Sequence, residues 1–139
     1  MILRISVLVG SLLLLLSSMA SAQVVQRVAV TVPFAFVVGS SSLPAGDYSF
    51  ELNREGNRMI LRSEDGSERN ALMLVTNSLG ADPGKSYAAF HRYGSHYFLA
   101  EVWRQGSGQS ITPGDLERKL ASKQATWELA RVEARVSGR

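Results

Sequence analysis

Apolar and polar residues alternate strictly near the beginning of the chain. From Val28 to Phe36 every even position holds valine or phenylalanine, and every odd position holds alanine, threonine or proline. Side chains of a strand point alternately to its two faces, so this pattern predicts a half-buried β-strand. Pro33 has no N–H group for a neighbouring strand, and we therefore expect a sheet edge or a bulge near that residue.

Three further segments predict strands, and polar turns rich in Gly, Asn, Asp and Ser separate them. Residues 48–52 alternate between aromatic or aliphatic and polar side chains, and residues 58–62 form the expected return strand. Residues 70–76 are apolar at nearly every position. Because a strand that is buried on both faces shows a continuous apolar run, we expect a covering layer on each side of this strand.

Residues 87–103 predict a β-hairpin. Gly94 and Ser95 fit a two-residue turn with glycine at its first central position. The register that this turn sets places Glu101 opposite Ala88. Both faces of the hairpin carry large apolar side chains, so we expect a sheet to cover one face and a helix to cover the other.

The covering helix is expected near the C-terminus, over residues 112–135. Thr112 resembles an N-cap residue, and Pro113 suits the first helical position. An apolar stripe at helical spacing follows these two residues. Its members are Leu116, Leu120, Trp127 and Ala134.

Together these segments predict a mainly β fold: an antiparallel meander of about six strands with one C-terminal amphipathic helix. Short turns between sequential strands favour either a small sandwich or a partly open barrel. Subtracting residues 1–22 from the 139 leaves 117 residues, which suffice for one domain with one core. We therefore expect a single β domain over residues 23–139.

Residues 1–22 have the three-part pattern of a secretory signal peptide. Arg4 supplies the positive start, an apolar run extends to Leu16, and the small residues at 20–22 form a cleavage site. The apolar run is shorter than a transmembrane helix requires. We therefore expect export to the periplasm or to the outside of the cell, with no membrane span after cleavage.

The amino-acid composition limits the kinds of functional site that the chain can form. The chain contains no cysteine, which excludes disulfides, thiolate metal sites and cysteine nucleophiles. Loss of Arg4 with the signal peptide lowers the count of Lys and Arg from 15 to 14, against 12 Asp and Glu. This small excess forms no dense basic patch, so we expect no nucleic-acid partner. We expect no cofactor either, because no glycine loop of the phosphate-binding kind is present.

His91 and His96 are the two histidines of the chain, and the hairpin places them diagonally on one face. A zinc site needs three or four ligands, and Glu101, a candidate for the third, belongs to the opposite face in this register. We therefore expect no metal. A hydrolase would use one of the two histidines as its base, but the sequence contains no Gly-x-Ser-x-Gly nucleophile elbow.

Aromatic residues concentrate in the same hairpin. Such rings most often pack in a core, and they also suit an apolar ligand or a carbohydrate, because they combine flat apolar faces with polar tips. The candidate ligand-binding residues are Tyr87, His91, Tyr93, His96, Tyr97 and Trp103.

Four motifs occur in a fixed order along the expected domain. They are V-P-F-A-F-V-V-G at 32–39, L-P-A-G-D-Y at 43–48, F-H-R-Y-G at 90–94 and Y-F-L-A-E-V-W at 97–103. In this order they resemble a group of small exported proteins common in Acidobacteria. The resemblance implies export and one coherent fold, and it implies no catalytic or ligand-binding role.

The sequence therefore favours an exported, non-enzymatic β domain with a binding or structural role, whose partner is an unidentified protein or small molecule. A second hypothesis is a carrier for a small apolar ligand or a carbohydrate. A third hypothesis is a hydrolase that uses His91 or His96.

Overall fold

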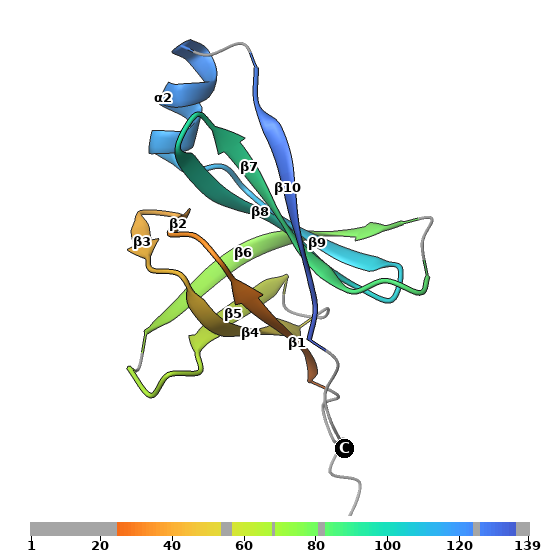
Figure 1. The fold of residues 1–139 in the computed structure, drawn as a ribbon. Coiled ribbons are helices and arrows are strands. Elements are labelled where there is room, and N and C mark those ends of the chain that lie inside the picture. Colours follow the sequence, from red (N-terminus) through yellow and green to blue (C-terminus); the bar gives the residue numbers. More distant parts are fainter. Residues whose placement is uncertain (1–24, 54–56, 68, 81–82, 124–125, 136–139) are drawn as a thin grey trace, which may run out of the picture.

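The computed structural model describes residues 25–53, 57–67, 69–80, 83–123 and 126–135 (Figure 1). The expected signal peptide at residues 1–22 lies outside these ranges. Ten strands and one helix occur within them, which confirms the mainly β fold with one helix. The elements are β1 (Gln26–Val32), β2 (Phe36–Val38), β3 (Ser41–Leu43), β4 (Gly46–Asn53), β5 (Arg58–Ser63), β6 (Asn70–Leu79), β7 (Tyr87–Tyr93), β8 (His96–Arg104), β9 (Ser107–Ile111), α2 (Asp115–Lys123) and β10 (Glu128–Glu133).

Neighbouring strands follow the order β1-β4-β5-β6-β9-β8-β2-β3, and β7 pairs with both β8 and β10. The pairings are antiparallel except for the parallel contact of β2 with β8. β6 joins the two layers visible in Figure 1, because its first half pairs with β5 and its second half with β9. The described strands form an open sheet rather than a closed barrel. An isolated bridge between Val30 and Ala134 links β1 to the residue after β10.

The core lies between the two layers. The inward valines of β1 are all buried, as the alternation predicts. Phe36 of β2 extends this apolar set, and its ring makes edge contacts with Tyr48 and Phe90 at centroid distances of 5.1 and 5.3 Å. Such contacts suit aromatic rings in a close-packed interior. The other buried members of the core cluster are Val38, Leu43, Phe50, Leu52, Met59, Leu61, Met73, Val75, Ala88, Leu99 and Val102.

Pro33 divides the first alternating segment into two strands. β1 ends at Val32 and β2 begins at Phe36, so one expected strand is two in the structure. Phe34 lies between them, half-buried, and its ring stacks on Tyr97 with 3.8 Å between the centroids. The division follows from the missing N–H group of proline, through which a hydrogen-bonded ladder cannot continue.

The expected helix over residues 112–135 is wrong in its second half. α2 covers Asp115–Lys123, and Glu128–Glu133 form β10 instead. β10 pairs with β7 residue by residue and satisfies backbone groups that would otherwise lie at a sheet edge. Ala130 and Val132 alternate toward the core. Six residues are too few to separate a period of two from the helical period in a sequence.

Other boundaries also differ from the expected ones. β2, β3 and β9 are short, and β9 (Ser107–Ile111) has no apolar alternation, so the structure has more than six strands. The N–H group of Arg118 donates to the carbonyl of Gly114, so α2 begins after Gly114 and Thr112 is not its N-cap. The part of the chain that the structure describes contains no helix long and apolar enough to cross a membrane.

The hairpin of β7 and β8 has the expected register between its turn and Phe90. Gly94 has a φ of 62°, a value that favours glycine at the first central position of the turn. A bulge at Phe90 then shifts the ladder, so Glu101 pairs with Ala89 rather than with Ala88. The extra residue in β8 reverses which side chains face the core beyond the bulge.

β6 is covered on one face only. Met73 and Val75 are buried, whereas Leu72 and Leu74 are 65 % and 71 % exposed. The expected second layer over residues 70–76 is therefore wrong. The described helix, α2, lies at the other end of the molecule, beside β7 and β8 (Figure 1). Two large apolar side chains of β6 consequently face solvent.

Candidate functional site

Helix α2 turns a carboxylate toward the sheet where the sequence predicts leucine. Glu117 is only 4 % exposed, whereas Leu116, the first member of the predicted apolar stripe, is exposed. Leu120, one turn after Leu116, is half-buried. Burial of an ionised carboxylate is costly unless charged or polar partners compensate for the lost water. Glu117 therefore marks the place to examine for functional chemistry.

Two candidate residues of β7 supply those partners. The Nδ1 atom of His91 lies 2.8 Å from Oε1 of Glu117, and the hydroxyl of Tyr93 also hydrogen-bonds to this carboxylate. His91 and Tyr93 are two positions apart on one strand, so their side chains leave the same face of the sheet. One helical carboxylate thus joins two sheet residues across the interface between α2 and β7.

The contact fixes the orientation of the imidazole. An ionised carboxylate only accepts hydrogen bonds, so His91 donates its Nδ1 proton to Glu117. When the ring is neutral, Nε2 then carries the lone pair and accepts hydrogen bonds from other groups. The side chain of His91 is about a quarter exposed (24 %), whereas that of Glu117 is almost fully covered. His91 therefore connects the buried carboxylate to the surface.

Tyr93 is held in its neutral form. Burial raises the pKa of its hydroxyl above the ordinary value, and the negative charge of Glu117 and the hydrogen bond to Glu117 raise it further. A phenolate beside a carboxylate in a dry environment is unfavourable, so the hydroxyl keeps its proton and donates it. Tyr93 thus acts as a hydrogen-bond donor to Glu117 throughout the neutral range.

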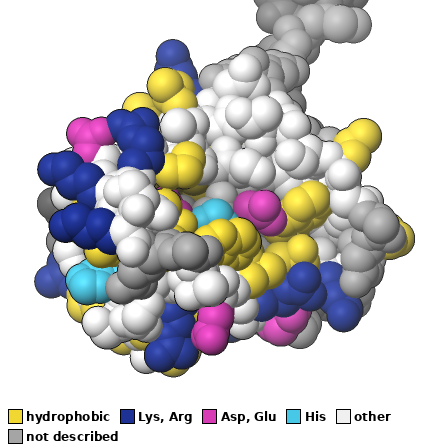
Figure 2. Space-filling view, turned by 90° about the horizontal axis from the view of Figure 1, so that it is seen from above, with side chains coloured by type: hydrophobic (Ala, Val, Ile, Leu, Met, Phe, Trp, Pro, Cys, Tyr) yellow, Lys and Arg dark blue, Asp and Glu magenta, His cyan; other side chains and the backbone are white. Residues whose placement is uncertain are grey.

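Apolar side chains form a rim around His91. Trp127 packs on the imidazole with 4.2 Å between the ring centroids and is 49 % exposed. Leu129 pairs with His91 in the register of β10 and β7 and is 52 % exposed. Trp127 and Leu129 make up the surface that we call the helix-side rim. In Figure 2, which views the molecule from the α2 end, hydrophobic side chains gather beside a histidine and an acidic side chain.

Two surface depressions flank α2 and β10. One, of about 340 Å³, is lined by Arg92, Gly94, Thr126 and Glu128, at the turn of the hairpin. The other, of about 510 Å³, lies at the beginning of α2. Basic residues line both depressions, and Figure 2 shows Lys and Arg side chains to the left of the hydrophobic area and below it. The residues of the second depression are Val37, Gly39, Ser40, Gly114, Asp115, Leu116, Arg118 and Lys119.

The structure separates the six predicted ligand-binding residues. His91 and Tyr93 meet at Glu117, whereas Tyr97 lies on the opposite face of the hairpin and stacks on Phe34. His96 is exposed at the turn. The remaining two candidates, Tyr87 and Trp103, pair with each other at the end of the hairpin farthest from its turn.

Tyr87 and Trp103 belong to a second aromatic group. Their rings are nearly parallel, with 6.2 Å between the centroids and 24° between the planes. The guanidinium carbon of Arg131 lies 3.9 Å from the centroid of the Tyr87 ring, within the range of a cation–π contact. Trp103 donates its indole N–H to the Glu101 carboxylate at 2.7 Å. These contacts fix both rings against the sheet, so packing accounts for their arrangement.

Sequence analysis missed three members of the site: Glu117, Trp127 and Leu129. An acidic residue in the first turn of a helix is common, because it interacts favourably with the helix dipole, so Glu117 carries no distinctive signal. Trp127 and Leu129 were placed on a helix, whereas the structure has β10 at Glu128–Glu133 and Trp127 immediately before it. In the described ranges, no group of three or more His, Cys, Asp or Glu residues is arranged to hold a metal ion.

Comparisons of the chain with known protein families, with curated proteins and with solved structures give no match. The resemblance of four motifs to small exported proteins of Acidobacteria therefore stays a prediction. The function has to be argued from the geometry of the site itself.

Proposed function

We propose that this protein is an exported, non-enzymatic binding domain, and that the helix-side rim is its ligand-binding surface. The ligand is a small amphiphile: an apolar body for the rim and a polar head group for the imidazole and the basic residues beside it. The observation that carries the proposal is the part-buried contact between His91 and Glu117, which orients one polar group beside two exposed apolar side chains.

The rim supplies the apolar contact. Trp127 comes from the segment before β10 and Leu129 from β10, and each is about half exposed. Half-exposed apolar side chains that converge on one polar group are typical of ligand sites, where apolar contact gives affinity and the polar group gives orientation. A ligand that covered these residues would remove their apolar surface from water.

His91 supplies the polar contact. Its Nδ1 atom is engaged by Glu117, so Nε2 is the nitrogen that meets a ligand. A neutral ring accepts a hydrogen bond there, and a protonated ring donates one to an anionic head group. Arg118 and Lys119 line the adjacent depression together with Asp115. Because Asp115 pairs with Arg118, Lys119 gives the lining a net positive charge that favours a head group with negative charge.

The packing of the interior favours a ligand that binds at the surface over a ligand enclosed within the protein. The rings of Phe36, Tyr48 and Phe90 meet by edge contacts between the layers, and the two depressions described above open at the surface beside α2. This favours a carrier whose ligand lies on the helix-side face over one whose ligand lies within the sheet.

Fluorescent amphiphiles test the proposal. The purified exported protein is titrated with 1-anilinonaphthalene-8-sulfonate, which has an anionic head group, and with N-phenyl-1-naphthylamine, which has none. We expect saturable binding of both probes at one site, with tighter binding of the sulfonate. Trp127→Ala should weaken binding at least fivefold, because about 1 kcal/mol of apolar contact corresponds to that factor. Leu129→Thr provides a second variant of the same rim.

Leu79→Thr is the matched control, because Leu79 is exposed at the end of β6, away from the rim. It should bind both probes as the wild type does. Native mass spectrometry of protein from its host should show a co-purified small molecule that the Trp127→Ala variant lacks. Equal loss of probe binding in the control, or non-saturable binding, would overturn the proposal.

A second candidate function is acid–base catalysis by His91. The 2.8 Å contact between His91 and Glu117 is the arrangement of a catalytic base and its orienting acid. Hydrolysis of an ester or amide that disappears in His91→Gln but persists in His96→Gln would favour this candidate over binding alone.

A further inference from the structure

The outward face of β1, β4, β5 and β6 combines exposed leucines with arginines. The registers of the four strands align Arg27, Glu51, Ile60 and Leu72 in one row across this face. The next row places Arg58 beside Leu74, and exposed Val25 precedes β1 on the same side. This face lies on the opposite side of the strands from the core and does not include the helix-side rim.

The apolar part of the face is the exposed side of β6 and its neighbour. Leu72 and Leu74 are two positions apart, so they project in the same direction, and Ile60 lies beside Leu72 on β5. Exposure of large aliphatic side chains to water is unfavourable. When several such side chains are contiguous, the patch often marks a contact surface.

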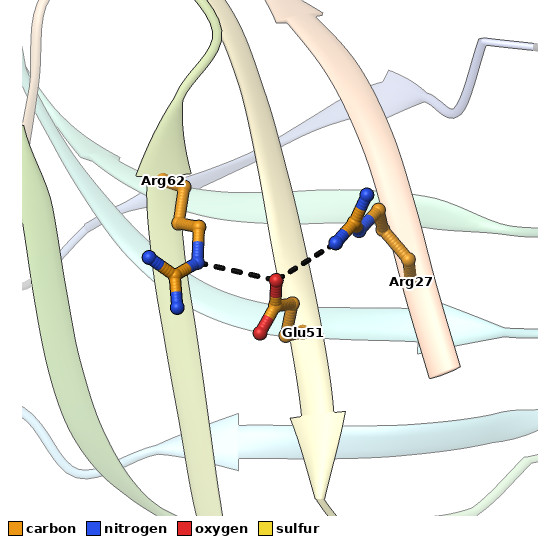
Figure 3. Close-up of polar contacts among 3 residues, drawn as sticks. All are labelled: Arg27, Glu51 and Arg62. Carbon is orange, nitrogen blue, oxygen red and sulfur yellow. Dashed lines mark hydrogen bonds and ion pairs between the residues drawn. The ribbon is translucent and has the colours of Figure 1, made fainter. Parts of the chain in front are cut away.

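The charged part of the face is basic near the leucines. Glu51 accepts hydrogen bonds from Arg27 at 2.9 Å and from Arg62 at 3.1 Å, so one carboxylate lies between two guanidinium groups (Figure 3). Each guanidinium has five N–H donors, and Glu51 uses only one of each. Arg58 adds a third positive charge beside Leu74. The described residues around Ile60 therefore carry three positive charges and one negative charge.

The other end of the face carries acidic residues. Asp47, the second residue of β4, lies on the outward side, where it accepts a hydrogen bond from Thr31. Glu64, at the end of β5, pairs with Arg135. Leucines and arginines therefore lie together at one end of the face, and Asp47 and the ion pair of Glu64 with Arg135 lie at the other.

We propose that the leucine and arginine end of this face binds the surface of an anionic lipid bilayer. The aliphatic side chains enter the boundary between head groups and acyl chains, and the guanidinium groups contact lipid phosphates. Arginine suits this role, because its planar guanidinium binds phosphate with two parallel hydrogen bonds and its methylene stem lies along apolar surface. The acidic end of the face points away from the bilayer.

Charge complementarity favours a lipid surface over a second copy of the chain. Two copies that met through this face would bring six guanidinium groups together with two Glu51 carboxylates, and like charges would repel. A bilayer that contains phosphatidylglycerol supplies many anions to one such face. The same argument predicts that added salt weakens binding.

Vesicle co-sedimentation tests the proposal with the purified exported protein. Vesicles of equal parts phosphatidylglycerol and phosphatidylcholine should bind at least tenfold more protein than vesicles of phosphatidylcholine alone. The Leu72→Thr and Leu74→Thr double variant, which keeps residues that suit a strand, should lose most binding. Arg58→Gln should weaken binding about fivefold, the factor expected for one basic residue at an anionic surface. Leu79→Thr and Lys85→Gln, two exposed residues outside this face and outside the helix-side rim, are the matched controls and should bind as the wild type does.

A single cysteine gives an independent measurement, because the chain contains none. A polarity-sensitive dye on Leu74→Cys should shift its emission to the blue when anionic vesicles are added, and the same dye on Leu79→Cys should not. Equal binding to both kinds of vesicle, equal loss in the controls, or a dimer in sedimentation analysis that Leu72→Thr and Leu74→Thr dissociate would each overturn the proposal. None of these outcomes depends on probe binding at the helix-side rim.

Discussion

Trp103 lies across Gly108, the residue opposite it on the neighbouring strand β9. A Cβ atom on Gly108 would lie 2.6 Å from the indole ring, and one on Gly80 would lie 2.4 Å from it. Both distances are too short for carbon atoms, so the ring occupies space that only glycine leaves open. The hydrogen bond from the indole N–H to Glu101 holds the ring in this place.

Gly108→Ala should therefore destabilise the fold. The new methyl group has to displace the indole, and overpacking of this kind costs about 1–3 kcal/mol of the free energy of unfolding. Urea unfolding measures the loss. In a Trp103→Leu background the same substitution should cost less, because the flat ring is gone. An equal cost in both backgrounds would show that the contact between the ring and Gly108 is not its cause.

Removal of the Glu117 carboxylate should loosen α2. Glu117→Ala leaves the half-buried His91 donor and the buried Tyr93 donor without their partner, which costs about 1–3 kcal/mol. Hydrogen exchange should show faster opening of α2, and chemical denaturation should show the lower stability. Glu128→Ala is the control, because Glu128 forms an exposed ion pair with Arg92 that contributes less than about 1 kcal/mol. Unchanged exchange in α2 would contradict this account.

Alkaline pH should destabilise the protein through two tyrosines. Burial is the first cause that raises the pKa of both Tyr48 and Tyr93, and the Tyr48 hydroxyl also donates to the carbonyl of Pro44 at 2.6 Å. Their ordinary pKa is 10.0, so above that pH the unfolded chain loses these protons before the folded chain does. The stabilisation is complete below pH 10 and is lost as the pH rises through the folded pKa values.

Denaturation at a series of alkaline pH values measures this loss. Tyr93→Phe should reduce the dependence of the unfolding free energy on pH, and the double variant with Tyr48→Phe should reduce it further. A slope that stays unchanged in both variants would mean that other groups cause the alkaline loss.

Asp65 should titrate at unusually low pH. Its pKa is lowered from 3.8 to about 2, first by the hydrogen bond from the Ser63 hydroxyl and then by those from the side chain and backbone of Ser67. Because the folded pKa is the lower one, the stabilisation is present above pH 3.8 and is lost as the pH falls through the folded value. NMR titration of the carboxyl carbon measures the pKa.

Ser63→Ala should raise the pKa of Asp65 toward 3.8, since it removes the largest of these contributions. Ser67→Ala should raise it less, because the backbone N–H of residue 67 still donates to Asp65 Oδ1 at 2.8 Å in the wild-type geometry. A larger effect of Ser67→Ala than of Ser63→Ala would contradict this order of causes.

Much of the fold follows from local patterns. The inward valines of β1, the β4–β5 pair and the turn at Gly94 agree with prediction, because period-two alternation and glycine at a positive φ are strong local signals. The covered faces of the β7–β8 hairpin also agree, since β7 carries Phe90 into the core and His91 toward α2. The alternation and the turn depend on residues close in sequence, whereas the layers that cover the hairpin come from distant segments.

The candidate site was predicted only in part. His91 and Tyr93 were selected because they are polar or aromatic residues in an apolar hairpin, and both contact Glu117. Glu117 itself has no sequence signal, since an acidic residue in a first helical turn normally faces solvent. Trp127 was assigned to a helix, because the sequence does not reveal that the segment directly after it, β10, pairs with β7.

The sequence by itself determined which residues are apolar, where the chain turns and which segments alternate between apolar and polar residues. These features depend on side-chain chemistry and local backbone geometry. Only the tertiary structure decided that β10 completes the sheet beside β7, that a bulge reverses the faces of β8 and that Leu72 and Leu74 stay exposed. Those outcomes depend on how separate segments pack against one another, which local sequence patterns do not encode. The burial of Glu117 belongs to the same class, because its partners come from a distant strand.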